Sequence, residues 1–142
     1  MKLVDLNVLL YATDSTSIHH EVARDWLDRT ISSAETVGIP TAVAIGYVRL
    51  TTSARVMADP LDVDTSVGVV SEWYRRPNVT APEPTERHLG LLAGLLRDLG
   101  TAGNLVADAH LAALAIEHGA ELVTFDRDFG RFSGLRWAAP TP

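Results

Sequence analysis

Short apolar runs alternate with longer amphipathic stretches along the chain, and this alternation predicts a mixed α/β fold. Apolar runs too short for a helix predict buried strands, whereas apolar residues three or four apart among charged ones predict surface helices. The predicted strands are residues 3–5, 37–40, 121–125 and 135–138, with a short extended piece at 77–82. The predicted helices are residues 7–12, 18–32, 41–55, 63–75, 84–99 and 104–117.

Buried strands separated by helices are typical of an open, mostly parallel sheet that helices cover on both faces. We therefore expect an α/β fold with a central, mostly parallel sheet. Residues 1–138 would form a single domain, and the proline-rich residues 139–142 a short frayed tail.

Three aspartates stand out because each follows or interrupts a segment that is predicted to be buried. Asp5 and Asp126 come at the ends of predicted strands, and Asp108 lies near the start of an otherwise apolar helix. An unpaired buried carboxylate is costly, so three of them at the edges of buried elements indicate one shared cation. In open parallel sheets ligands collect at the carboxyl ends of strands, where Asp5 and Asp126 are expected.

Carboxylate oxygens are the ligands that Mg²⁺ and Mn²⁺ prefer, and a cation held by them can activate water against a phosphodiester. The candidate catalytic residues and metal ligands are therefore Asp5, Asp108 and Asp126, with Asn7 and Asp128 as supporting groups. Plainer explanations exist for each residue: a helix cap for Asp5 and Asn7, a turn for Asp126 and Asp128, and an arginine partner or an exposed first helical turn for Asp108. The five together favour metal-assisted hydrolysis.

Composition narrows the classes of function. The 142 residues carry a net charge of −6, so any contact with nucleic acid must be local rather than spread over a basic surface. Cysteine is absent, which excludes disulfide scaffolds and thiolate metal sites and agrees with a reducing compartment. With neither a membrane-length apolar run nor a leader pattern, the expected location is the cytoplasm, without membrane contact.

The segments around the three aspartates resemble the PIN-domain ribonucleases, and among them the VapC-type toxins. The similar segments are LVDLNVLLY at residues 3–11, NLVADAHLAALA at 104–115 and LVTFDRDF at 122–129. The resemblance implies a three-layer α/β/α sandwich and Mg²⁺- or Mn²⁺-dependent cleavage of RNA. It also implies a homodimeric toxin of a type II toxin-antitoxin system, whose acidic pocket a VapB-type antitoxin covers.

One acidic residue of the family pattern is missing. Asp5, Asp108 and Asp126 match its first, third and fourth acids by position. The second is commonly a glutamate three residues before an arginine, and here Gly46 stands three residues before Arg49. Glycine offers no ligand, so we expect one metal ion rather than two.

Two other interpretations stay open from the sequence. The first is a catalytically weak PIN-like module that binds RNA or a partner, which Gly46 favours. The second is another metal-dependent phosphotransfer enzyme or a phosphoacceptor receiver domain. A receiver domain should have a lysine late in the chain, but Lys2 is the only lysine. The aspartate-nucleophile phosphatases have a second aspartate two residues after the first, and here Asn7 occupies that position. His110 follows Asp108 by two positions, so on a helix it is expected to point away from the acids.

Overall fold

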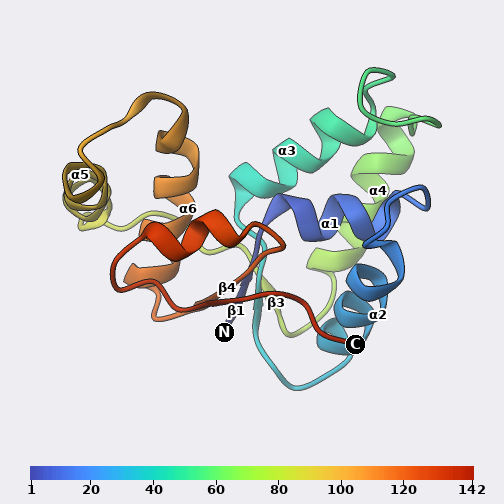
Figure 1. The fold of residues 1–142 in the computed structure, drawn as a ribbon. Coiled ribbons are helices and arrows are strands. Elements are labelled where there is room, and N and C mark those ends of the chain that lie inside the picture. The colour runs from blue at the N-terminus through green and yellow to red at the C-terminus, as the bar shows by residue number, and fades with distance from the viewer.

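Five short parallel strands form the centre of the molecule (Figure 1). The structure is a computed structural model that describes all 142 residues. In chain order the strands are β1 (Lys2–Val4), β2 (Val37–Gly38), β3 (Val79–Thr80), β4 (Glu121–Val123) and β5 (Trp137–Ala138). Their order across the sheet is β3-β2-β1-β4-β5, and all four neighbouring pairs are parallel. The expected α/β fold around a parallel sheet is confirmed.

The strand order reverses at β1, and this reversal places the acidic residues. The chain passes from β1 to β2 and β3 on one side, and then adds β4 and β5 on the other. Val4 pairs with Val123, so Asp5 and Thr124 are the first residues beyond the ends of β1 and β4. The backbone N–H of Asp5 continues the ladder by donating to the carbonyl of Val123 at 3.0 Å. Such a reversal point is where open α/β sheets bind ligands.

Six helices connect the strands. They are α1 (Leu6–Thr13), α2 (His20–Ile31), α3 (Thr41–Thr51), α4 (Val63–Tyr74), α5 (His88–Leu99) and α6 (Val106–Glu117), with short 3₁₀ turns at Gly103–Leu105 and Arg127–Arg131. In Figure 1, α5 and α6 lie together, apart from α1 to α4. The helices end close to the predicted positions. Gly100, for example, ends α5 in the left-handed conformation at φ 68°, which glycine adopts without strain.

Two residues whose side chains are typical of helix caps, Thr41 and Asn104, do not cap the helices that follow them. Thr41 is the first residue of α3 rather than its cap, and its hydroxyl donates to the distant Glu83 and accepts no hydrogen bond from the start of the helix. Asn104 lies inside the 3₁₀ turn before α6, and no side-chain cap is formed at the start of that helix. Both residues have the right chemistry for a cap, but tertiary contacts or a preceding turn fix a different backbone there.

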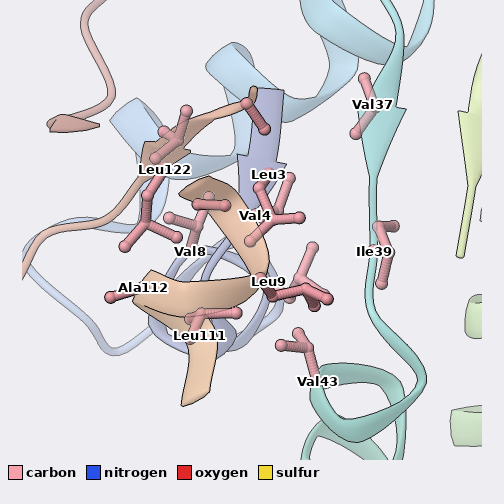
Figure 2. Close-up of a cluster of buried hydrophobic side chains, with 14 of the residues drawn as sticks. Leu3, Val4, Val8, Leu9, Val37, Ile39, Val43, Leu111, Ala112 and Leu122 are labelled. Carbon is pink, nitrogen blue, oxygen red and sulfur yellow. The ribbon is translucent and has the colours of Figure 1, made fainter. Parts of the chain in front are cut away.

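The hydrophobic core is continuous. Twenty-six buried residues form one cluster that joins the sheet to its surrounding helices. Figure 2 shows its centre, where Leu3 and Val4 of β1 face Leu9 of α1, and Leu111 and Ala112 of α6 approach from another side. Leu3, Val4 and Leu9 have no exposed surface, so the two elements that flank Asp5 are held firmly.

The C-terminal tail stays in contact with the domain. Pro140 is buried, and the guanidinium of Arg29 on α2 donates to the carbonyl of Thr141 at 2.8 Å. None of the helices combines the length and the apolar character that crossing a membrane requires.

Candidate functional site

An open cleft of about 970 Å³ lies beside the carboxyl ends of β1 and β2. Its lining comes from the starts of α1 and α3, from α5 and from the first half of α6. Asp5 and Asp108 both line this cleft, although 103 positions separate them in the chain. We call these two residues the acidic wall. Asp126 is not among the lining residues.

Asp5 is fixed in position by three neutral donors. Its Oδ1 accepts from the backbone N–H of Leu6 at 2.7 Å, so Asp5 also caps α1, as its plainer explanation expects. Its Oδ2 accepts from the Asn7 amide at 2.7 Å and from the Thr124 hydroxyl at 2.6 Å. The supporting role predicted for Asn7, that of orienting Asp5, agrees with this contact.

Thr124, which was not among the residues predicted from the sequence, connects the ends of β1 and β4. It is fully buried, and its hydroxyl accepts from the Asn7 amide at 3.0 Å and from the backbone N–H of Asp126 at 2.9 Å. The backbone N–H of Phe125 donates to Asn7 Oδ1 at 3.2 Å. Thr124 therefore positions Asp5 and Asp126 together. Its only signal in the sequence is its place at the end of a buried strand, two residues before an acid.

The three aspartates affect one another electrostatically. Burial raises the pKa of Asp5 above its ordinary value, hydrogen bonds from Thr124 and Leu6 oppose this, and the charges of Asp108 and Asp126 add to the rise. Burial also raises the pKa of Asp108, and so does the charge of Asp126. The ionised carboxylates therefore repel one another, and a bound cation would reduce this repulsion.

The arginine whose charge acts on Asp108 already has another partner. The charge of Arg131 opposes the rise in the pKa of Asp108. However, its guanidinium binds Asp128 Oδ2 at 3.0 Å and the Asp128 carbonyl at 2.7 Å. No ion pair involves Asp5, Asp108 or Asp126. The exposed Asp128 is therefore engaged by Arg131 on the surface, and the acidic wall has no cationic side chain bound to it.

The donor set suits a hard divalent cation. It consists of carboxylate oxygens held by neutral donors, with free lone pairs and unrelieved repulsion. No group of three or more acidic or histidine side chains has the arrangement to hold a metal ion directly. Mg²⁺ commonly needs only one or two carboxylates and keeps several of its waters. The assignment of Asp5, Asp108 and Asp126 to one cation stays a prediction.

The place of the missing acid is filled by a leucine. Gly46 is buried on α3, and a Cβ atom built on it would lie 2.8 Å from Cδ2 of Leu6. Leu6 itself lines the cleft next to Asp5. An acidic side chain at position 46 therefore could not enter unless Leu6 moved. The apolar contact replaces a ligand here, which agrees with the expectation of a single metal ion.

The cleft also carries a second polar group, which we call the histidine wall: His88 on α5 and His110 on α6, which line the cleft, with Glu117 on α6 bonded behind them. His88 bonds to Glu117 at 2.6 Å and to His110 at 2.8 Å. His110 has no hydrogen bond to any of the three aspartates, but His110 and His88 line the same cleft as Asp108. Asp108 and His110 point in different directions from α6, but the cleft is wide enough for both side chains to line it.

Burial and neighbouring groups shift the pKa values on the histidine wall. Burial and the charge of His88 lower the pKa of His110, against the opposing charges of Glu117 and Glu83. Burial acts to raise the pKa of Glu117, but hydrogen bonds from Thr85 and His88 outweigh it, and the pKa of Glu117 is lowered. Glu117 is therefore ionised at neutral pH.

Other aromatic and basic side chains lie away from the acidic wall. Trp26 and Trp73 are buried packing residues. Arg49 is exposed beside an apolar groove between α3 and α4 and pairs with no acid of the cleft. Arg127 is exposed at the start of its 3₁₀ turn.

Sequence comparison places the chain in a family. The PIN domain profile matches residues 2–135. Ribonuclease VapC37 of Mycobacterium tuberculosis is 46% identical over 140 residues, which cover 99% of this chain and 97% of that protein. Ribonuclease VapC33 of the same species is 39% identical over 140 residues, covering 99% of this chain and 98% of that protein.

Solved structures share the fold at much lower identity. The chain superposes on DNA-bound VapBC from Salmonella typhimurium with a TM-score of 0.68 at 20% identity, covering 99% and 98% of the two chains. VapBC2 from Rickettsia felis, bound to a promoter DNA fragment, gives a TM-score of 0.68 at 17% identity and covers 97% of each chain. The profile match, the full-length relatives and the shared fold agree: the chain belongs to the PIN-domain family and, within it, to the VapC ribonucleases.

Proposed function

We propose that this protein is the toxin of a type II toxin-antitoxin system and acts as a Mg²⁺- or Mn²⁺-dependent endoribonuclease. The observation that carries the proposal is the acidic wall, where Asp5 and Asp108 share one cleft and repel each other without a cationic partner. The names of the relatives, all ribonucleases of the VapC type, support RNA as the substrate.

Asp5, Asp108 and Asp126 would hold the cation. When bound, a divalent cation supplies an activated water and neutralises charge on the phosphodiester. Asn7, Thr124 and the Leu6 backbone hold both oxygens of Asp5, so its carboxylate would not rotate away when substrate arrives.

The partners follow from the family. The structural neighbours are VapBC complexes, so we propose that a VapB-type antitoxin binds this chain and covers the acidic wall. We also propose a homodimer. An antitoxin over the cleft would exclude RNA, and purified protein must therefore be freed of its partner before activity is measured.

The alternative function is binding with little turnover. Gly46 and Leu6 favour it, because the second family acid is replaced by an apolar contact. A weak PIN-like module of this kind would bind RNA or a partner but would cleave little or no RNA.

Cleavage of total cellular RNA by partner-free protein separates the two functions. With Mg²⁺ or Mn²⁺ we expect discrete fragments, and none after addition of EDTA. Asp108→Asn keeps the shape of the side chain and should lower the rate by more than about 100-fold, since even groups behind metal ligands contribute about 10- to 100-fold. The matched control is Asp98→Asn, an exposed acid on α5, which should cut like the parent. Cleavage that survives EDTA would contradict the metal mechanism, and folded protein that never cuts would favour the binding module.

A further inference from the structure

A chain of hydrogen bonds leads from the interior to the cleft through the histidine wall. The Glu117 side chain has no exposed surface, and its Oε2 accepts from the Thr85 backbone N–H at 3.2 Å and hydroxyl at 2.6 Å. Its Oε1 contacts His88 Nδ1 at 2.6 Å, and His88 Nε2 contacts His110 Nδ1 at 2.8 Å. His88 is 5% exposed, and His110 is half-buried. The order Glu117, His88, His110 therefore runs outward.

When both rings are neutral, as at pH 8, the donors and acceptors along this chain fix one tautomer of each imidazole. An ionised carboxylate can only accept, so the ring proton of His88 must be on Nδ1. His88 Nε2 is then an acceptor, and His110 must place its own proton on Nδ1 to donate to it. The remaining nitrogen of His110, Nε2, therefore carries a lone pair and no hydrogen.

This lone pair is available to a ligand. His110 Nε2 has no partner in the protein, yet the structure has no buried side-chain nitrogen or oxygen without a hydrogen bond. Nε2 must therefore be accessible, and the cleft is the space that His110 lines with Asp5 and Asp108. Phosphate oxygens can only accept hydrogen bonds, so this nitrogen suits a donor group of the substrate close to the phosphate.

We propose that His110 Nε2 accepts a hydrogen bond from a ribose 2′-hydroxyl next to the cleaved phosphodiester, and so helps this site to select RNA over DNA. The inference rests on the proposed ribonuclease function. The 2′-hydroxyl is the donor that RNA has and DNA lacks. It sits on the carbon beside the one that bears the 3′ oxygen, whereas the amino groups of bases lie farther from the phosphate. Glu117 and His88 are positioning residues in this arrangement, because they act only through His110.

The tautomers can be read without any RNA. Long-range ¹H–¹⁵N spectra of histidine-labelled protein at pH 8, where ordinary imidazoles are neutral, should show His110 protonated on Nδ1 and bare on Nε2. Glu117→Gln should reverse this pattern. With the amide oxygen of glutamine on Thr85, in place of Glu117 Oε2, its NH₂ donates to His88 Nδ1, which moves the proton of each ring to Nε2. A proton on His110 Nε2 in the parent protein would overturn the inference.

The contact with ribose is tested by substrates modified at one nucleotide. The cut site is mapped in total RNA, and synthetic RNA of that sequence is prepared with 2′-hydroxyl, 2′-deoxy or 2′-fluoro at each nucleotide flanking the cut. At one of these positions the parent should cut the hydroxyl substrate about 3- to 10-fold faster than the other two, the effect of one neutral hydrogen bond. Fluorine can accept but not donate, so it should behave like the deoxy sugar.

His110→Asn is the matched variant, because its amide can still bond to His88 while the Nε2 acceptor is gone. It should cut all three substrates at equal rates. Glu121→Gln removes a carboxylate at the far end of β4, where Glu121 binds Lys2, and should keep the parent's preference.

Three results would count against the contact, and they can be told apart. If His110→Asn still prefers the 2′-hydroxyl substrate, the ribose contact is wrong. The same holds if the deoxy sugar blocks cleavage by both the parent and the variant. In either case the ribonuclease function stands. If a base substitution rather than the sugar removes the effect, the donor is a base amino group and the ribose assignment is wrong. If no RNA is cut at all, the proposed function fails, and the ribose assignment fails with it.

Discussion

The acidic wall and the histidine wall face the same cleft but satisfy their polar groups in opposite ways. On the histidine wall, the buried Glu117 carboxylate has Thr85 and His88 as donors, and it is complete as folded. On the acidic wall, neutral donors fix Asp5, but its charge and that of Asp108 meet no cation. The difference indicates that the fold itself supplies the partners of the Glu117 charge, whereas the charges of the acidic wall are left without a partner that a bound cation would supply.

The largest expected effect comes from removing the buried acid of the histidine wall. Glu117→Ala leaves the ring N–H of the buried His88 without an acceptor, and it also removes the acceptor of the exposed Thr85. We expect the free energy of unfolding to fall by about 1–3 kcal/mol, measured by urea unfolding. The control Glu121→Ala breaks only a half-exposed ion pair with Lys2 and should cost less than about 1 kcal/mol. Equal losses in the two variants would contradict the special status of Glu117.

A smaller and opposite effect is expected on the acidic wall without metal. The pKa of Asp108 is raised in the folded state, so this carboxyl binds its proton more tightly there than in the unfolded chain. The stability that comes from this tighter proton binding is therefore fully present at pH values below the ordinary pKa of 3.8, and it is lost as the pH rises through the raised pKa of the folded state. At pH 7 the ionised Asp108 destabilises the metal-free protein. Asp108→Asn should then be more stable than the parent by less than about 1 kcal/mol, since Asp108 is partly exposed.

The same pair of proteins gives the control for this prediction. In urea unfolding with EDTA, the difference should shrink as pH falls toward about 4. Mg²⁺ at 100 times its dissociation constant should reverse the order at pH 7, because the parent gains about 2.7 kcal/mol from binding and the variant gains much less. A parent that stays less stable than Asp108→Asn in saturating Mg²⁺ would show that Asp108 does not hold the ion.

The smallest effect concerns the glycine that replaces the missing acid. Gly68 on α4 is exposed with open space around it, so Gly68→Ala should raise the free energy of unfolding by about 0.5–1 kcal/mol. Gly46→Ala should gain less or lose stability, because its Cβ would meet Leu6. In a Leu6→Ala background, Gly46→Ala should raise the free energy of unfolding as Gly68→Ala does. If Gly46→Ala gains as much as Gly68→Ala with Leu6 present, Leu6 does not restrict this position.

The local pattern of the chain predicted a large part of the fold. Apolar runs marked the strands, and glycine at position 100 marked a helix end, because periodicity and backbone preference are properties of neighbouring residues. The helix caps were less predictable. Thr41 and Asn104 have the side chains of caps, but the hydroxyl of Thr41 bonds to Glu83, which lies 42 positions away.

The sequence by itself determined that Asp5 follows β1 and that Asp126 comes soon after β4, because an acid after a buried strand is visible in the order of residues. Only the tertiary structure decided how the site is completed. Thr124 reaches Asp5 across 119 positions, and Glu117 reaches His88 across 29. Such contacts depend on strand register and on the packing of α5 against α6. Neither is encoded by the neighbours of a residue, since both arise from the burial of the whole core.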